Sequence, residues 1–261
     1  MTTHAVFCIV GQMKLSVTII TYNEEDRLED ALKSVRHIAD EIVVVDSHST
    51  DNTVKITEKY DARVLFNTFD NYGDQKNIAL QNATHEWVLN LDADERVSPE
   101  LAESVLRLKS SVDIEADGYL IKRKTQYLGR WIMHSGWYPD RKLRLFKKSK
   151  SHWSGRIHES LNLEGRLEKL EGEILHFTYR DMNDHIQRLN RYSYMQAQDI
   201  VARGKKALYL RALILPSITF IRFYIWKLGI LDGYPGFIIA LVSSWGTAMK
   251  YLKAIAIKRG Q

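Results

Sequence analysis

The chain has 261 residues, 45% of them hydrophobic, which suits one large α/β domain with an appendage and excludes a disordered protein. Its single cysteine excludes an internal disulfide framework and a cysteine-based zinc site. The net charge of +5 divides into −11 over residues 1–121, +9 over 122–150, −2 over 151–199 and +9 over 200–261. An acidic front and two basic blocks predict a protein that works beside anions: phosphate esters, an anionic membrane surface or nucleic acid.

Strands and helices alternate over the first half of the chain. The apolar, β-branched runs that predict buried strands are residues 15–21, 41–46, 63–66 and 87–91. The helical patterns between and after them are residues 28–38, 54–60, 73–83 and a stretch that begins at Ser98-Pro99. This alternation indicates right-handed βαβ units and a parallel sheet. The chain contains neither GxGxxG nor GxxxxGK[ST], so the signatures of a dinucleotide-binding fold and of a P-loop are missing.

The pattern changes after residue 117. Residues 118–123 predict a strand, and short extended pieces follow to about residue 146. Two further strand-like stretches lie at 152–161 and 172–179, before a helix over 181–201 with Asp181 as its N-cap. We therefore expect an α+β half that packs onto the first half, and a domain over residues 13–200.

Residues 201–261 predict a separate helical region. The uncharged run 233–249 and the apolar stretch before it both fall short of the roughly 20 apolar residues that a bilayer span needs. Tryptophan and tyrosine side chains occur there among leucine- and isoleucine-rich turns flanked by cations. This pattern favours a pair of amphipathic helices at a membrane surface, with ordinary helices packed on the domain as the alternative.

Polar side chains recur just after the predicted strands end. Thr21-Tyr22-Asn23 follows the first strand, Asp46 closes the second, and Asp92-Ala93-Asp94 follows the fourth. Ligands of open α/β sheets bind outside the carboxyl ends of the strands, so we expect these residues to converge. Two carboxylates separated by one residue suit Mg²⁺ or Mn²⁺, although such a pair alone is also common in loops and helix caps. Asp46 offers acceptors to a ribose or a base, or caps a turn.

Four segments, VTIITYNEE, EIVVVDSHSTDNT, NYGDQKNIAL and WVLNLDADE, occur in this order. Together they resemble the family 2 glycosyltransferases of GT-A fold, over roughly residues 14–200. The later IHE and LHF patterns resemble more narrowly the lipopolysaccharide core glycosyltransferases, in particular β-1,4-glucosyltransferases that act on inner-core heptose. The resemblance implies a Rossmann-related nucleotide-sugar-binding sheet and an α+β acceptor half. It also implies metal-dependent, inverting transfer, with UDP-glucose as the preferred donor, at the cytoplasmic face of the inner membrane.

The resemblance also implies roles for individual residues. Those matching the nucleotide-sugar site are Thr21, Tyr22, Asn23, Glu24, Asp46, Lys76, Asn77 and Asp92. Those matching the metal site are Asp92 and Asp94, with His176 either a third ligand or a core histidine. The divalent cation would neutralise charge that develops on the nucleoside diphosphate as it leaves.

The acceptor side is predicted from residue chemistry. An inverting transfer needs a base for the acceptor hydroxyl, and Glu159 is the preferred candidate, with His158 second. The glutamate-aspartate pair that often carries this role in the family is missing. Cations and aromatic rings of the basic block suit a phosphorylated glycolipid; the predicted acceptor residues are Arg123, Trp137, Arg141 and Arg144.

Three alternatives remain beside this hypothesis. A family 2 transferase with another donor, or with a polyprenyl-phosphate acceptor, fits the same motifs. A sugar-1-phosphate nucleotidyltransferase would show a glycine-rich basic loop after the first strand, where this chain has TYNEE. A non-catalytic basic module that binds membranes or nucleic acid is the third, but no RRM, KH or helix-turn-helix signature supports a nucleic-acid partner.

Overall fold

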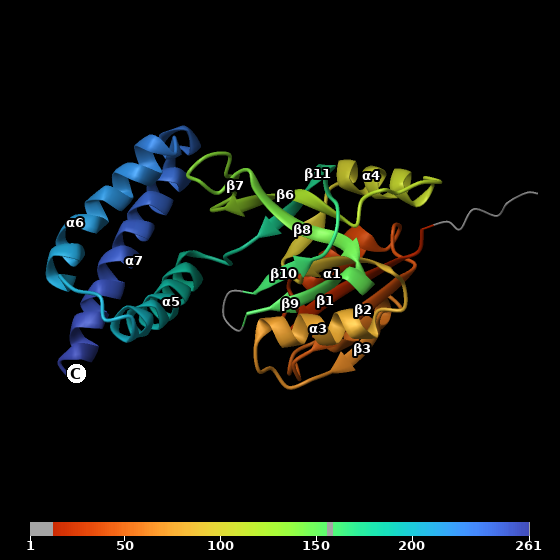
Figure 1. The fold of residues 1–261 in the computed structure, drawn as a ribbon, viewed down its shortest axis with the longest axis horizontal. Helices are drawn as coiled ribbons and strands as arrows, with labels where there is room; N and C mark the ends of the chain where they lie inside the picture. The colour runs from red at the N-terminus through yellow and green to blue at the C-terminus, as the bar shows by residue number, and fades with distance from the viewer. Residues whose placement is uncertain (1–12, 156–158, 261) are drawn as a thin grey trace, which may run out of the picture. The chain divides into compact units, whose positions relative to one another are not determined.

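The computed structural model describes residues 13–155 and 159–260 (Figure 1). These described residues form two compact units. The first unit takes its residues from Met1–Arg123 and Arg141–Leu175, and the second from Lys124–Asp140 and His176–Gln261. Packing thus groups the helix predicted over 181–201 with the C-terminal helices, whereas the sequence placed a domain boundary at residue 200.

Four parallel strands form the centre of the first unit. They are β1 (Leu15–Thr21), β2 (Glu41–Asp46), β3 (Arg63–Phe66) and β4 (Trp87–Asp92), in the spatial order β3-β2-β1-β4. The prediction of four strands in an α/β fold is confirmed. Continuous apolar runs form β1, β2 and β4 because both faces of these strands are covered and their side chains are almost all buried.

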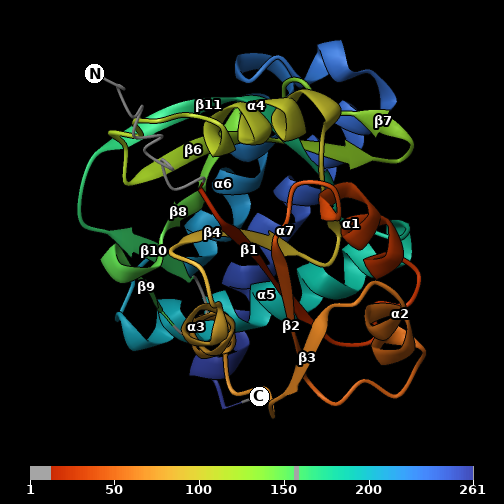
Figure 2. The same ribbon diagram turned by 90° about the vertical axis from the view of Figure 1, so that its right-hand side faces the viewer.

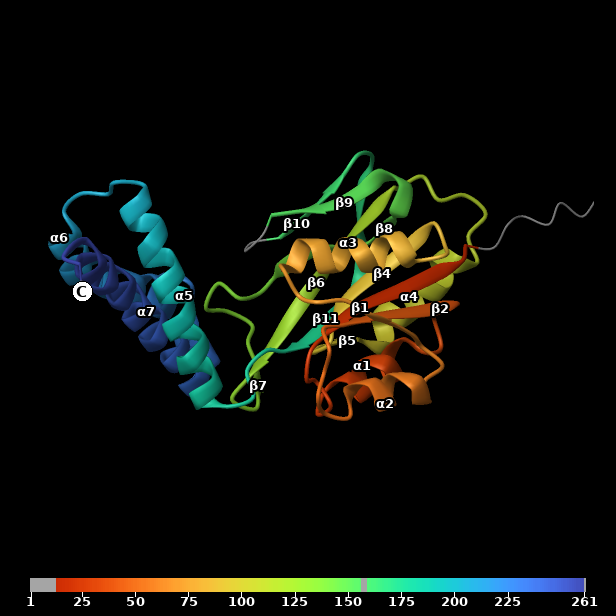
Figure 3. The same cartoon turned by 90° about the horizontal axis from the view of Figure 1, so that it is seen from below.

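Helices cover both faces of this parallel sheet. They are α1 (Leu28–Val35), α2 (Thr53–Lys59), α3 (Tyr72–Asn82) and α4 (Pro99–Lys109). Figures 2 and 3 show α3 on one side of β1 and β2, with α1 and α2 on the other. The predicted start of α4 is confirmed, because the Ser98 hydroxyl accepts the backbone N–H of Leu101 at 3.2 Å and Pro99 takes the first helical position.

The sheet continues beyond β4 with mostly antiparallel neighbours. Among the described residues its order runs β3-β2-β1-β4-β8-β6-β11-β5, and β8 pairs antiparallel with β4. The added strands are β5 (Glu95–Val97), β6 (Gly118–Tyr127), β7 (Arg130–Trp131), which pairs with β6, β8 (Asp140–Lys147) and β11 (Leu167–Phe177). A 3-10 turn (Lys148–Lys150) precedes a separate antiparallel pair, β9 (Ser151–Ser154) and β10 (Ser160–Leu163). The prediction of strands after residue 117 is confirmed.

The second unit is built on three long helices. They are α5 (Met182–Ala202), α6 (Leu208–Ile221), which continues as a π-helical turn (Arg222–Trp226), and α7 (Tyr234–Lys258), preceded by a 3-10 turn (Gly229–Asp232). Both α5 and α6 pack along α7 (Figure 1). The predicted cap of α5 is confirmed, since the Asp181 carboxylate accepts the N–H of Asp184 at 2.7 Å.

One helical stretch of the second unit is long and apolar enough to cross a membrane. Leu208–Trp226 spans 19 residues with a mean hydropathy of 1.4, and 6% of it is buried inside the structure. Sequence pattern predicted that this stretch falls short of a bilayer span, whereas the helix meets the length and composition of one. It continues through Arg222 as a π turn, so neither Arg211 nor Arg222 ends it. This finding concerns length and composition only. The predicted association with a membrane surface stays a prediction.

His185 gives the second unit a testable pH dependence. Its Nδ1 lies 2.6 Å from the hydroxyl oxygen of Tyr127, its ring stacks on Tyr179 at 4.0 Å, and it is 6% exposed. Burial lowers the pKa of His185 to about 4, from an ordinary value of 6.5. Because the unfolded chain binds a proton more readily than the folded chain between these values, acid destabilises the fold over that range.

We expect the free energy of unfolding to fall by about 2 kcal/mol through this group between pH 7 and pH 4.5. Denaturant titrations of the wild type and His185→Gln at both pH values measure the difference. The variant should lose that part of the pH dependence. An identical pH dependence in the two proteins would assign the acid sensitivity to other groups.

Candidate functional site

The strands of the parallel sheet bring the predicted residues to one edge. Thr21 at the end of β1 lies opposite Asp46 at the end of β2, and Ile20 of β1 lies opposite Asp92 at the end of β4. Since all three strands are parallel, the loops that follow them emerge together. The predicted convergence of the three polar segments is confirmed for the first unit.

The loop after β1 is fixed to the loop after β2. Asn23 takes a left-handed conformation with φ 52°, its N–H donates to the Ser49 hydroxyl at 2.8 Å, and its side-chain oxygen accepts the N–H of Thr50 at 2.8 Å. The N–H of Glu24 donates to the Thr53 hydroxyl at 2.9 Å. Tyr22, between these anchors, is 58% exposed. The two loops therefore form one pre-shaped surface with an exposed aromatic ring.

Thr21 and Asp46 differ in whether their side-chain oxygens already have hydrogen-bond partners within the protein. The Thr21 hydroxyl oxygen is buried and has no hydrogen-bond partner among the described residues. Both carboxylate oxygens of Asp46 accept from Ser49, one from its hydroxyl at 2.5 Å and one from its N–H at 2.7 Å. The structure thus gives Asp46 the turn-capping contacts that sequence treated as the alternative, and its contact with a nucleoside stays a prediction.

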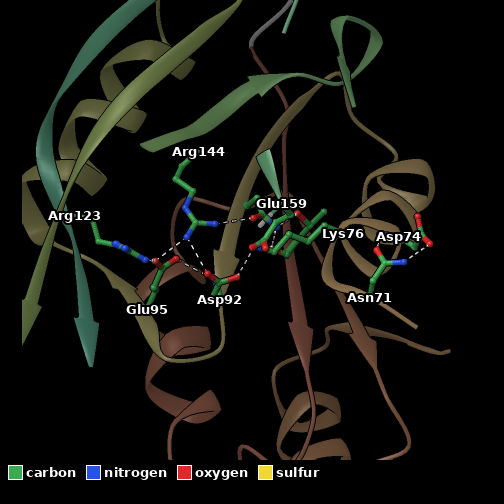
Figure 4. A network of polar contacts seen from close by, with 10 residues as sticks. Asn71, Asp74, Lys76, Asp92, Glu95, Arg123, Arg144 and Glu159 are labelled. Carbon is green, nitrogen blue, oxygen red and sulfur yellow. Dashed lines mark hydrogen bonds and ion pairs between the residues drawn. The ribbon is translucent and has the colours of Figure 1, made fainter. Parts of the chain in front are cut away.

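Asp92 lies between two cations. Lys76, from α3, and Arg144, from β8, each place a nitrogen 2.9 Å from one of its two carboxylate oxygens (Figure 4). Burial opposes ionisation, but these two ion pairs hold the pKa of Asp92 well below its usual range. Asp92 is therefore a fixed negative charge at the end of β4.

Glu95 is a site residue that the sequence reasoning missed. It is fully buried, accepts from Arg144 at 2.8 Å and from the N–H of Asp92 at 3.1 Å, and lies 3.4 Å from Arg123 (Figure 4). Burial works against the charged form of the Arg144 guanidinium, but Glu95 and Asp92 together raise the pKa of Arg144 above its ordinary value. A glutamate directly after the DAD triplet, at the start of a short strand, was the available sequence signal.

Asp94 has a cationic neighbour that sequence also missed. The Arg27 guanidinium lies 3.6 Å from an Asp94 oxygen, and the two side chains are 9% and 17% exposed. Arg27 is the one cation within the acidic stretch NEEDRLED, which is the signal that could have identified it. Among residues 13–155 and 159–260, no three His, Cys, Asp or Glu side chains form a group that could hold a metal.

Lys76 connects the predicted donor side to the predicted base. Its amino group lies 2.9 Å from Asp92 and 3.0 Å from Glu159 (Figure 4). The same amino group lies 4.7 Å from the centre of the Trp153 ring. The lysine is 2% exposed, and Glu159 is 23% exposed. The other candidate base, His158, lies outside the described residues. The structure thus joins two predicted functions, distant in sequence, through one buried cation.

Asn77 has a clear architectural contact. Its amide donates to the carbonyl of Trp153 at 2.9 Å, and its amide oxygen accepts the N–H of the same residue at 2.9 Å. This paired contact fixes β9 against α3 and so positions Trp153 over Lys76. The predicted contact of Asn77 with a nucleotide stays a prediction.

The predicted acceptor residues do not share one environment. Arg144 is 4% exposed and bonded to Asn90, Asp92 and Glu95, and Arg123 approaches Glu95. Arg141, at the start of β8, is exposed. Trp137 belongs to the second unit, where its ring lies 5.5 Å from that of Tyr127. The acceptor roles stay predictions. The contacts of Arg144 place it against Asp92 and Glu95.

His176 also belongs to the second unit. Its Nδ1 lies 3.3 Å from the Thr125 hydroxyl. Its role, as a third metal ligand or as a core histidine, stays a prediction.

Comparison with known proteins gives one consistent result. The family model described as Glycosyl transferase family 2 matches residues 16–159. The lipopolysaccharide core biosynthesis glycosyltransferase LpsC of Rhizobium meliloti is 31% identical to this chain, over 96% of each protein. An uncharacterised glycosyltransferase of Rickettsia typhi is 29% identical, over 92% of this chain and 86% of the relative. Among solved structures, S. aureus TarS 1–349 in complex with UDP-GlcNAc is 18% identical, with a TM-score of 0.47 over 95% of this chain and 93% of TarS.

Proposed function

Because this chain belongs to glycosyltransferase family 2, we propose that it moves glucose from UDP-glucose to an inner-core heptose of lipopolysaccharide, inverting the anomeric carbon. The name of the R. meliloti relative supports the acceptor class, and the resemblance of the TYNEE and VVVD segments supports a uridine nucleotide. The single observation that carries the proposal is the Asp92–Lys76–Glu159 contact. One lysine contacts both Asp92, the proposed diphosphate-side carboxylate, and Glu159, the proposed base, which supports a site shared by donor and acceptor.

The charges of the site are balanced. The four cations and four acids that contact one another or follow one another in the chain are Arg27, Lys76, Arg123, Arg144, Asp92, Asp94, Glu95 and Glu159. The diphosphate of a nucleotide sugar adds two negative charges, and a divalent cation restores neutrality. Leaving charge uncompensated in such a partly buried site is costly, so the balance favours donor and cation binding together.

The residues present fit Mg²⁺ or Mn²⁺. The DAD triplet supplies two carboxylates, Asp92 and Asp94, and hard divalent ions take such oxygens together with phosphate and water oxygens. Both side chains retain some exposure, 31% and 17%, so a ligand can reach them. When bound, the cation would neutralise negative charge on the leaving diphosphate.

Glu159 is the proposed general base. Its carboxylate takes the proton of the attacking acceptor hydroxyl while the oxygen bonds to the anomeric carbon and the bond to the diphosphate oxygen breaks. Lys76 holds Glu159 in place from one side and Asp92 from the other. Trp153 excludes water from the lysine by covering it with its ring. Lys76 therefore positions both groups that the transfer needs.

The nucleoside is proposed to bind over the joined loops of β1 and β2. Tyr22 offers an exposed ring for stacking on a base, and the Thr21 hydroxyl offers a buried group that lacks a partner among the described residues. Asn23 and Glu24 shape the loop through their contacts with Ser49 and Thr53. Together these features support a nucleotide at this edge of the sheet.

The second unit is proposed to associate peripherally with the cytoplasmic face of the inner membrane. Its α6, α7 and the turns between them expose large apolar side chains: Leu213 at 76%, Trp226 at 70% and Tyr234 at 67%. Residues 200–261 carry ten lysines and arginines against a single acid, Asp232. Apolar surface together with excess cations suits an anionic bilayer surface.

Donor and metal binding can be tested by thermal shift. We expect UDP-glucose with Mn²⁺ or Mg²⁺ to raise the midpoint of unfolding, because a ligand of the native state stabilises it. Chelation with EDTA should remove most of this shift, and Asp94→Asn should show little of it. The matched control is Asp113→Asn, an exposed aspartate of the same unit. An undiminished shift in Asp94→Asn, or no shift with any nucleotide sugar, would contradict the proposal.

A further inference from the structure

Asp232 is a buried acid of the second unit that the proposed transfer does not use. It is 2% exposed and accepts from the N–H of Met133 at 3.0 Å, the N–H of His134 at 3.1 Å and the Ser135 hydroxyl at 2.9 Å. A second contact to His134 runs from Asp232 Oδ1 to the ring Nδ1, at 3.1 Å. One carboxylate therefore fixes three successive residues of the loop after β7 to the turn before α7.

The contact with Asp232 sets the orientation of the His134 ring. Since Nδ1 faces the carboxylate, the other ring nitrogen is the atom that His134 presents away from it. The side chain is 33% exposed, so solvent reaches part of the ring. With Nδ1–H donating to the carboxylate, the other nitrogen of a neutral ring is an acceptor, so the Asp232 contact orients the ring without giving the surface a hydrogen-bond donor.

Two further cations lie beside the same loop. A Cβ placed on Gly233 would be 2.9 Å from Nη1 of Arg130, and one on Gly136 would be 3.7 Å from the side chain of Lys227. The carbonyl of Lys227 also accepts the N–H of Ser135 at 2.8 Å. We call Arg130 and Lys227, the two cations beside the loop that carries His134, the cationic cluster.

The backbone around the cationic cluster is held in costly conformations. Ser135 and Leu228 both have left-handed φ angles, 58° and 53°, although neither is a glycine. Such conformations persist where surrounding contacts determine them, and they are common at binding sites. Ser135 is fully buried, so the loop is anchored in the interior of the unit.

Exposed apolar side chains flank the cationic cluster. Leu228, Ile230 and Leu231 are 50%, 55% and 56% exposed, on the short turn that carries Asp232. Trp226 and Tyr234, on either side of this turn, are 70% and 67% exposed. Cations beside protruding apolar groups match a lipid, whose phosphate and chains lie next to each other.

We propose that the cationic cluster binds the phosphate of a membrane lipid, with residues 228–231 and Tyr234 against the acyl region. The inference rests on the proposed membrane association and deepens it by naming the group that is recognised. Arg130 and Lys227 supply the positive charge, and Asp232 holds the loop beside which they lie.

The test compares vesicles of equal surface charge. One set contains phosphatidic acid in phosphatidylcholine, and the other contains oleate in phosphatidylcholine, so that only the first adds an exposed phosphate monoester. We expect the wild type to bind the first set more tightly, and Arg130→Gln or Lys227→Gln to lose about fivefold in affinity for it.

Lys206→Gln is the matched control, because it removes one exposed cation of the same unit outside the cationic cluster. Circular dichroism checks that the variants fold, and the replaced side chains of Arg130 and Lys227 are exposed. Equal losses in Lys206→Gln and the cluster variants, or equal binding of the wild type to both vesicle sets, would overturn the inference. Inorganic phosphate should compete with the phosphatidic acid vesicles more than with the oleate vesicles, and equal release of both sets would also overturn the inference.

Two failures remain distinguishable. A wild type that binds neither vesicle set overturns both this inference and the proposed membrane association. A wild type that binds both sets equally overturns the inference alone. The nucleotide-dependent thermal shift is measured without vesicles and is independent of either result.

Discussion

Replacing Lys76 by methionine is expected to lower sugar transfer by about 100-fold or more, because positioning errors at a catalytic group carry penalties of that size. Methionine keeps the stem against Trp153 but removes the charge that Asp92 and Glu159 share. The two carboxylates then lose their common partner, and breaking such a buried pair costs about 3 kcal/mol of folding stability. Both kcat and the free energy of unfolding are therefore expected to fall.

Steady-state kinetics and denaturant titration on the same preparation measure the two effects. Lys169→Met, at an exposed lysine of β11 in the same unit, is the matched control and should change neither by much. Lys76→Arg keeps the charge and separates the loss of charge from the loss of fit. Full activity in Lys76→Met would show that Asp92 and Glu159 do not depend on the lysine that joins them.

Glu159→Gln is expected to lower kcat by about 10²–10⁴-fold, the usual contribution of a general base. Glutamine preserves the size of the side chain and can still accept from Lys76, so the lysine should stay in place. Donor binding should therefore persist, and the thermal shift with UDP-glucose and metal should resemble that of the wild type. The expected signature is lost turnover with retained binding.

The control for this variant is Glu164→Gln, at an exposed glutamate after β10. It should transfer sugar at the wild-type rate. If Glu159→Gln lost donor binding together with turnover, its role would be structural. If it kept turnover within a few-fold of the wild type, the base would be another residue.

Local sequence pattern predicted the first half of the fold well. The predicted strands at 15–21, 41–46 and 63–66 match β1, β2 and β3 to the residue. For β1 and β2 the reason is that strands buried on both faces read as continuous apolar runs. The caps at Ser98 and Asp181 were likewise readable, since capping depends on side chains close in the chain. The position of the DAD triplet followed from the end of β4.

Contacts between distant residues could not be read in this way. Lys76 and Glu159 are 83 residues apart, and Arg144 and Glu95 are 49 apart, so no periodicity links them. Arg144 was assigned to the acceptor because it stands in a basic block, whereas its neighbours along β8 gave no sign that Asp92 and Glu95 would bury it. Pairing across a sheet, which local pattern does not contain, decides such environments.

The helical second unit shows the same limit in another form. In the sequence, Arg211 and Arg222 divide the apolar stretch into pieces shorter than a bilayer span. In the structure, Leu208–Trp226 is one continuous helical stretch of which 6% is buried. Asp232 was read only as the one acid in a basic block, although its four contacts organise the loop that carries His134. The sequence shows that Asp232 is an acid in a basic block, but its hydrogen-bond partners are visible only in the folded structure.

The most direct measurement is transfer itself, followed by mass spectrometry of an inner-core lipopolysaccharide acceptor incubated with UDP-glucose and Mn²⁺. The wild type is predicted to add one hexose, with the product lost on EDTA treatment and in Glu159→Gln. Equal product from the wild type and Glu159→Gln, or no product from the wild type with any nucleotide sugar, would contradict the proposed transfer.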